Sequence, residues 1–342
     1  MQFSTEAPQP GVQPVLKEIT PQLLQEEREA RDKFVDTEVS ALFAEAKPYA
    51  VGIGDVLAVN LIGQSELPSV SVMLAPIPNS AADSMVGSGY AVDQDGQVYL
   101  PYVGAVKVVG MTMRDLHIEF EKQFSKFIKR PDFTVQVASY RSKRIYIAGE
   151  VKSPGVMPII DIPMTLPDAL GRAGGWTNMG DPAAIEINRD GKTYVVNIPR
   201  MTARGMNPSR ILLENGDLVR IPSREESSVF VIGDVAKPTV VMPLNGHLSL
   251  NQALSGAGGV DAVSGNPRQV YVVRHASDQH PNVYHLDAAS PVALALAESF
   301  EMQPKDVVYV DAAPLARWNR IVSLILPTAQ LVVDSKYLNV IK

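Results

Sequence analysis

The chain has 342 residues, of which 46% are hydrophobic and 20% are charged, so it is long enough for two to four globular domains with buried cores. Its formal net charge of -6, without a basic stripe interleaved with aromatic residues, argues against a nucleic-acid partner. The absence of cysteine excludes disulfides, thiolate catalysis and cysteine-based zinc sites. The first residues lack the basic start and apolar stretch of a signal peptide, which leaves open a cytosolic protein or a mature form without its leader.

The N-terminal region predicts a lead-in, a strand and a helix. Residues 1–14 are rich in proline and predict no regular element. Residues 15–20 predict a strand that joins the sheet of a neighbouring module. Thr20 followed by Pro21 predicts the start of a helix that runs to about Ala46. We interpret the charged run at residues 26–33 as a solvated face of this helix.

A module is predicted between Tyr49 and Tyr140. The segment GIGDVLAVNL, residues 52–61, predicts a turn that leads into an alternating strand. Its two glycines do not make a dinucleotide-binding loop, because their spacing is too short and no helix follows. The next segment, from Gln64 to Tyr90, is rich in Pro, Ser, Ala and Gly. Long loops of this kind are usually functional or disordered, so the segment is either a gate or an insertion without a gating role.

The second half of this module predicts a hairpin, a helix and a closing strand. Asp95-Gly96 predicts a tight turn, and a calcium loop is the weaker interpretation because no Glu stands at the closing position. Thr112, with Asp115 three residues later, predicts a capped helix. The predicted buried stripe of this helix comprises Leu116, Phe120, Phe124 and Phe127. The alternating residues of the strand after it are Phe133, Val135 and Val137.

The remainder of the chain contains an internal repeat. RIYIAGEVKSPG, residues 144–155, matches SVFVIGDVAKPT, residues 228–239, with a spacing of 84 residues. Each copy predicts two strands, a short helix capped by Thr165 or Ser249, and an Ala-Gly-Gly exit. Each copy returns to a similar final strand, GDLVRIP or KDVVYV, which the GDVL of the first module also resembles. The pattern indicates two β-grasp-like modules, each with a short helix on a small mixed sheet.

The C-terminal residues 313–342 are the most apolar region of the chain. On a helix, one side would be small or polar: Ala316, Arg320, Ser323, Pro327, Gln330 and Asp334. A helix from Leu315 to Leu338 would be about 36 Å long, enough to cross a hydrocarbon core of about 30 Å. The polar stripe does not suit a single helix in lipid. The pattern therefore fits either a helix docked on a soluble core or several copies around a water-filled lumen.

Enzymatic sites are weakly represented in the sequence. His275, His280 and His285 cluster in the second repeat, where a polar hairpin is favoured over a metal site. A G-x-S-x-G elbow is absent, which disfavours Ser-His-Asp chemistry, and no cleft signature supports a glycosidase carboxylate pair. We expect no catalytic residues, no metal and no cofactor.

The ordered motifs resemble one known family. Residues 49–61 with 92–110 resemble the polysaccharide export (PES) domain, and the two repeats resemble SLBB domains with their [IV]-x-G-[ED]-V, [TS]-L-x-x-A-L and A-G-G signatures. APLARWNRIVSLILPT, residues 313–328, is similar to the C-terminal helix of Wza-type outer-membrane polysaccharide exporters. The resemblance predicts an α+β chain with these domains: an N-terminal strand and helix at 1–48, PES at 49–141, SLBB at 142–226 and 227–312, and an amphipathic transmembrane helix at 313–342.

The resemblance also implies a function and partners. It implies an outer-membrane channel that passes capsular or exopolysaccharide from the periplasm to the cell surface. The channel would be a ring-shaped homo-oligomer, an octamer in the Wza type, with most of its mass in the periplasm and a barrel of C-terminal helices in outer-membrane lipid. An inner-membrane polysaccharide co-polymerase, often a tyrosine autokinase, is the implied protein partner. The family usually has an acylated N-terminal cysteine, which this sequence lacks.

Roles for residues of the C-terminal helix follow from its pattern. Arg317, Trp318 and Arg320 stand near its start and are predicted at the membrane interface. The predicted lumen-facing residues are Arg320, Ser323, Gln330 and Asp334, and the predicted lipid-facing residues are Ile321, Val322, Ile325 and Val332. Two other classes remain as alternatives: a soluble periplasmic carbohydrate-binding or scaffold protein of the same pathway, and a polysaccharide-modifying enzyme.

Overall fold

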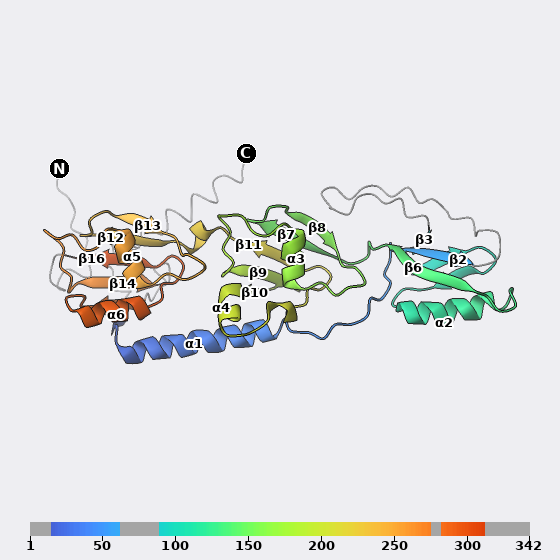
Figure 1. The fold of residues 1–342 in the computed structure, drawn as a ribbon, viewed down its shortest axis with the longest axis horizontal. Coiled ribbons are helices and arrows are strands. Elements are labelled where there is room, and N and C mark those ends of the chain that lie inside the picture. The colour runs from blue at the N-terminus through green and yellow to red at the C-terminus, as the bar shows by residue number, and fades with distance from the viewer. Residues whose placement is uncertain (1–14, 62–88, 275–281, 312–342) are drawn as a thin grey trace, which may run out of the picture. The chain divides into compact units, whose positions relative to one another are not determined.

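The computed structural model describes residues 15–61, 89–274 and 282–311 (Figure 1). The chain divides into two units. One combines the N-terminal residues up to Phe34 with the chain from Ser223 onward, and the other is Val35–Pro222. Helices and strands are mixed throughout, which confirms the predicted α+β class. The first module and the first repeat each have one hydrophobic core cluster, and the second repeat has two.

The first module is a small antiparallel sheet covered by one helix. Strands β2 (Val56–Leu61), β3 (Tyr90–Ala91) and β6 (Phe133–Ser139) pair in the order β3-β2-β6, and β4 (Gln97–Leu100) pairs with β5 (Gly104–Lys107). Helix α2 (Met113–Phe124) begins at Thr112, whose hydroxyl accepts from the Asp115 amide as predicted. Leu116, Phe120 and Phe124 are buried in the core of this module.

Two predictions for this module need correction. Phe127 is 60% exposed, because α2 ends at Phe124 and a turn carries Phe127 away from the buried stripe. The Asp95-Gly96 turn is present, and Gly96 has a φ of 75°. The strands on its two sides belong to different sheets, since β3 pairs with β2 while β4 pairs with β5.

The first repeat forms a mixed five-stranded sheet. It contains β7 (Arg144–Gly149), β8 (Gly155–Pro158), α3 (Leu166–Arg172), β9 (Ile185–Arg189), β10 (Lys192–Val196), α4 (Ile198–Ala203), the short helix η1 (Pro208–Arg210) and β11 (Leu218–Ile221). The strand order is β10-β9-β11-β7-β8. Only the β7–β11 pair is parallel within this sheet, because the chain crosses over through α3, β9, β10 and α4 before it returns.

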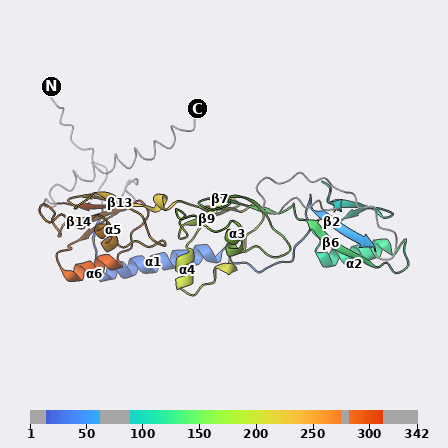
Figure 2. The same ribbon diagram turned by 45° about the horizontal axis from the view of Figure 1, so that its top comes forward.

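The second repeat has the same order with one strand added. After η2 (Arg224–Ser227), it contains β12 (Val229–Gly233), β13 (Thr239–Val241), α5 (Leu250–Gly256), β14 (Val270–Arg274), β15 (Asn282–Leu286), α6 (Pro291–Ser299) and β16 (Val307–Val310). The order is β1-β15-β14-β16-β12-β13. Helix α5 contacts β12, β13, β16 and α6 (Figure 2). The repeat predicted from the sequence therefore corresponds to two modules with the same strand order.

The N-terminal strand completes the second sheet. Strand β1 (Val15–Glu18) pairs in parallel with β15, which confirms that this segment joins the sheet of another module. Ile19 follows it into the same hydrophobic core. Helix α1 (Pro21–Ser40) then begins with the Thr20 hydroxyl accepting from the Leu23 amide. The helix ends at Ser40 rather than near Ala46, because Val39 and Leu42 enter the core of the first repeat there.

Each repeat has a glycine that no other residue can replace without a clash. Gly149 and Gly233 have φ angles of 84° and 91°. A Cβ atom on Gly149 would lie 2.1 Å from the Ile221 carbonyl oxygen, and one on Gly233 would lie 2.2 Å from that of Val310. These glycines therefore let the first strand of each repeat lie against its final parallel strand.

Candidate functional surfaces

The predicted membrane-interface, lumen-facing and lipid-facing residues all lie outside the described residues. They are Arg317, Trp318, Arg320, Ile321, Val322, Ser323, Ile325, Gln330, Val332 and Asp334. Most of the predicted gate, Gln64–Tyr90, lies there as well. Its last residue, Tyr90, is buried on β3.

His285 has a structural setting, whereas His275 and His280 lie outside the described ranges. The His285 ring lies on β15, with Nδ1 2.8 Å from a Glu18 carboxylate oxygen and Nε2 2.8 Å from the Arg268 carbonyl oxygen. The Glu18 contact joins strand β1 to its neighbour β15. Within the described ranges, no three His, Cys, Asp or Glu side chains are grouped as metal ligands.

A buried aspartate precedes one strand of each module, namely the first strand of the first module and the final strand of each repeat. Asp55, Asp217 and Asp306 are 0%, 1% and 1% exposed, respectively. In each case the carboxylate accepts from the backbone amide three residues earlier, at 2.8–2.9 Å. The residue just before the aspartate has positive φ: Gly54, Gly216 and Lys305. The aspartate, with the residue of positive φ before it, thus forms the same tight turn in all three modules.

Each repeat neutralises its buried aspartate with one arginine. Arg189 donates to both oxygens of Asp217 at 2.6 and 2.9 Å, and Arg274 donates to Asp306 at 2.9–3.3 Å. Hydrogen bonding to Asp217 raises the pKa of Arg189. Burial is the largest single effect on Arg274 and lowers its pKa, but the charge and hydrogen bonds of Asp306, with Tyr284 and Glu27, together raise the pKa by more. The two arginines lie at the ends of the equivalent strands β9 and β14.

The first module stabilises its buried aspartate without a cation. The Asp55 carboxylate accepts from the Arg141 and Ser142 amides at 2.8 Å and from the Tyr49 hydroxyl at 2.7 Å. Burial is the main cause that raises the pKa of Tyr49. The three turns therefore have a structural role, because the buried carboxylates find their hydrogen-bond partners inside the protein.

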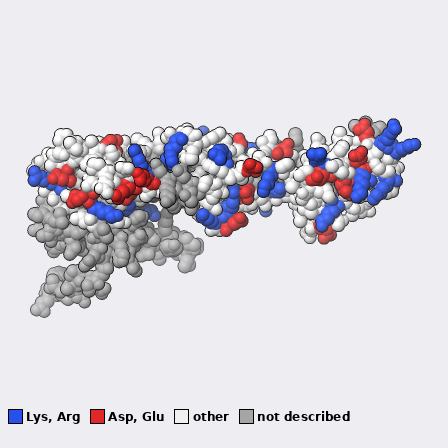
Figure 3. Space-filling model, turned by 90° about the horizontal axis from the view of Figure 1, so that it is seen from below, with Lys and Arg blue, Asp and Glu red and all other residues white. Residues whose placement is uncertain are grey.

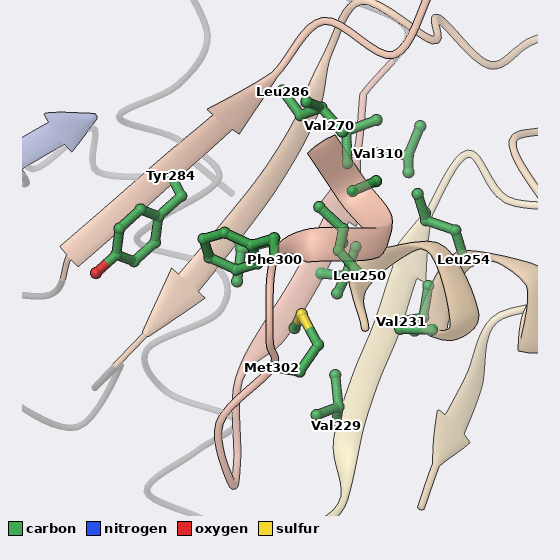
Figure 4. Packing of buried hydrophobic residues seen from close by; sticks show 14 of the residues in the cluster. Val229, Val231, Leu250, Leu254, Val270, Tyr284, Leu286, Phe300, Met302 and Val310 are labelled. Carbon is green, nitrogen blue, oxygen red and sulfur yellow. The ribbon is translucent and has the colours of Figure 1, made fainter. Parts of the chain in front are cut away.

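The charged run of α1 is not merely a solvated face. Glu27 accepts from Arg274 at 3.2 Å and from the Tyr284 hydroxyl at 2.9 Å, and Arg31 lies 3.0 Å from Glu301. The Arg274 guanidinium also lies 5.0 Å from the Tyr284 ring centre. Tyr284 packs against Phe300, as Figure 4 shows, with ring centres 5.2 Å apart. Two of the charged residues thus fasten α1 to the second repeat.

The contacts between α1 and the second repeat were not predicted from the sequence, because most of the charged run at residues 26–33 is exposed. Between Pro21 and Arg31, the partly buried residues of α1 are Leu23, Leu24, Glu27 and Arg31, at helical spacing. The spacing was the available signal, since positions three and four apart share a helix face. Acidic and basic side chains are otherwise mixed over the face that Figure 3 shows.

Of the helices in the part of the chain that the structure describes, none combines the length and the apolar composition that a membrane span requires. Helix α1 has 20 residues but is strongly charged. The C-terminal stretch that the pattern assigns to a membrane lies outside this part.

Family models match the chain in the predicted order. A polysaccharide biosynthesis/export protein model matches residues 44–138, and an SLBB domain model matches residues 143–221 and 227–310. The model of the C-terminal domain of the outer-membrane lipoprotein Wza matches residues 313–334. The last match covers all of the residues given roles in the C-terminal helix.

Similar proteins are named as polysaccharide export proteins. The EPS I polysaccharide export outer membrane protein EpsA of Ralstonia nicotianae is 44% identical over 92% of this chain and 85% of its own length. The capsule polysaccharide export protein BexD of Haemophilus influenzae is 23% identical over 81% of this chain and 74% of its own. The Vi polysaccharide export protein VexA/TviF of Salmonella typhi is 22% identical over 90% and 85%. The chain belongs to the Wza-type family of outer-membrane polysaccharide export proteins.

Proposed function

We propose that this protein is the outer-membrane channel of a capsular or exopolysaccharide export machine. The observation that carries the proposal is the 44% identity to an export outer membrane protein over 92% of the chain, together with the C-terminal match at residues 313–334. Passing a hydrated polymer through a water-filled channel requires a lumen that binds weakly and a membrane anchor, but no catalytic group. The names of the relatives, which are those of export proteins, agree with a role without catalysis.

The channel is a ring of identical subunits, an octamer by family resemblance. The N-terminal strand and helix, the PES module and the two SLBB modules keep the boundaries 1–48, 49–141, 142–226 and 227–312, and they lie in the periplasm. Residues 313–342 form the membrane helix. A polar stripe is costly in lipid, so a closed barrel that faces its stripes inward is the arrangement that suits this sequence.

Within the barrel, one side of each helix faces water and the other faces lipid or a neighbour. Arg320, Ser323, Gln330 and Asp334 face the lumen, and Ile321, Val322, Ile325 and Val332 face lipid or neighbouring helices. Arg317, Trp318 and Arg320 anchor the helix at the periplasmic membrane interface, where aromatic rings and long cationic side chains are favoured. The Gln64–Tyr90 segment narrows the periplasmic mouth.

The polymer arrives from an inner-membrane co-polymerase, which docks on the periplasmic side and is often a tyrosine autokinase. This partner follows from the family resemblance. Coexpression of the chain with a candidate co-polymerase and copurification in detergent tests it.

Deletion of residues 313–342 tests the channel. We expect the shortened chain to lose membrane association and ring size, as measured by membrane fractionation and by imaging of the particle in detergent. If both remained unaltered, the channel assignment would fail. A second test needs no deletion: Ser323→Trp is expected to reduce ion conductance in a planar bilayer, whereas Ile325→Trp is the control that changes it little.

A further inference from the structure

The β4–β5 hairpin of the first module exposes two tyrosines. Tyr99 is 75% exposed and Tyr102 is 78% exposed. The other tyrosines at the edges of this core, Tyr49 and Tyr90, are 8% and 6% exposed. The hairpin tyrosines therefore do not hold the core together, and their rings remain available for a ligand.

The register of the hairpin places Tyr99 on its outer face. Val98 pairs with Val106, and both side chains are buried. The alternate pairs are Gln97 with Lys107 and Tyr99 with Ala105, and paired residues share one face of a two-stranded ladder. Ala105 is small and exposed, so its side chain does not cover the Tyr99 ring. The outer face thus combines an aromatic ring with an amide and an ammonium group.

Tyr102 is held in a strained conformation at the tip of the same hairpin. Its φ is 66°, a left-handed value that glycine and asparagine adopt more easily than an aromatic residue. An exposed tyrosine gains little from burial there, so folding does not account for its presence. Residues held in sparsely populated backbone conformations cluster at active sites, ligand clamps and switch regions. Tyr99 and Tyr102 are three residues apart, which keeps their Cα atoms within about 10 Å.

We infer that this hairpin is a binding site for the sugar rings of a polysaccharide chain, formed by Tyr99, Gln97 and Lys107 on its outer face and by Tyr102 in its turn. The inference rests on the proposed export function, which supplies the polymer. Aromatic faces carry partial negative charge, and the C–H bonds on one face of a pyranose carry partial positive charge, so the two surfaces attract each other. Gln97 and Lys107 supply hydrogen bonds to hydroxyl groups, and Lys107 adds attraction for acidic sugars. A small exposed contact of this kind binds weakly, as transport requires.

The test titrates the full-length protein in detergent with two hexasaccharides, cellohexaose and hexagalacturonate, and follows binding by saturation-transfer NMR. Tyr99→Ala and Tyr102→Gly are each expected to weaken binding of both probes roughly three- to tenfold, the effect of losing one aromatic contact. Lys107→Gln is expected to weaken binding of hexagalacturonate alone. Phe127→Ala is the matched control, since Phe127 is also an exposed aromatic residue of this module, and it should change neither affinity.

Tyr102→Gly separates ligand binding from stability. Because glycine relieves the left-handed strain, the variant should unfold at a higher temperature while it binds sugar less well. The inference is overturned if the unsubstituted protein binds neither hexasaccharide, or if both tyrosine variants bind as it does. It is also overturned if they change the particle size but not binding, which would make this face a subunit contact. None of these results affects the channel proposal, which the deletion of residues 313–342 tests separately.

Discussion

Arg274 and Asp306 form a buried ion pair in the second repeat, with side chains 3% and 1% exposed. The same pair recurs as Arg189 and Asp217 in the first repeat, where the arginine is 14% exposed. In both, the arginine also donates to a backbone carbonyl, that of Glu301 or Leu212. The recurrence shows that the repeat preserves a polar core contact as well as a hydrophobic pattern.

Removal of the charge from Asp306 should destabilise the second repeat strongly. Asp306→Asn leaves Arg274 buried without its main counterion, and breaking such a pair costs about 3–5 kcal/mol. The free energy of opening, measured by amide hydrogen exchange of β14 and β16, should fall by this amount. Glu186→Gln is the control, because the Glu186–Arg220 pair is 36–37% exposed and should cost no more than about 1 kcal/mol. Equal effects of the two substitutions would contradict a strongly stabilising role for the buried pair.

The contact between Glu27 and the second repeat should hold the N-terminal strand in place. Glu27→Ala removes the acceptor for Arg274 and Tyr284, and hydrogen bonds to charged groups contribute about 1.5–3 kcal/mol. We expect faster hydrogen exchange at the Ile19 amide, which donates to the His285 carbonyl. Glu26→Ala is the neighbouring control, since the Glu26 side chain accepts from the exposed Gln22 on the same helix. Unchanged exchange in Glu27→Ala would show that the contact is not stabilising.

Alkaline pH should weaken the second repeat through Tyr284. Burial raises the pKa of this phenol from 10.0 to about 12, with opposing effects from Arg274 and Glu27. Because the folded pKa is above the unfolded one, the stabilisation is fully present below pH 10 and is lost as pH rises through about 12. Stability measured against pH should therefore decline less steeply in Tyr284→Phe. Identical slopes for the two proteins would refute the assignment.

The two kinds of glycine should respond differently to alanine. Gly233→Ala places a Cβ atom against the Val310 carbonyl and also strains a positive φ, so it should abolish the β12–β16 pairing. Gly191→Ala has the same backbone strain but no atom within 4 Å, and should cost about 1–2 kcal/mol. Circular dichroism and thermal unfolding of the two variants compare these effects. A Gly233→Ala protein as stable as Gly191→Ala would argue against close packing of Gly233 on strand β16.

The repeat and its caps could be predicted because they depend on local chemistry. The Thr165 and Ser249 caps and the Ala-Gly-Gly exits appear as expected, with the exit glycines at positive φ. The role of Glu27 could not be predicted, because its partner Arg274 lies 247 residues away and only the fold joins them. The strain at Tyr102 likewise depends on the length of the β4–β5 turn. The candidate lumen residues lie outside the described chain and remain predictions.

The amount of polysaccharide on the surface of living cells shows whether the C-terminal helices form a channel. Cells that lack this protein should be complemented with either the full-length chain or the chain without residues 313–342, and surface and periplasmic polymer should be quantified. Surface polymer is expected only with the full-length chain, and with the shortened chain the polymer is expected to stay in the periplasm. Equal surface polymer with both chains would contradict a channel formed by the C-terminal helices.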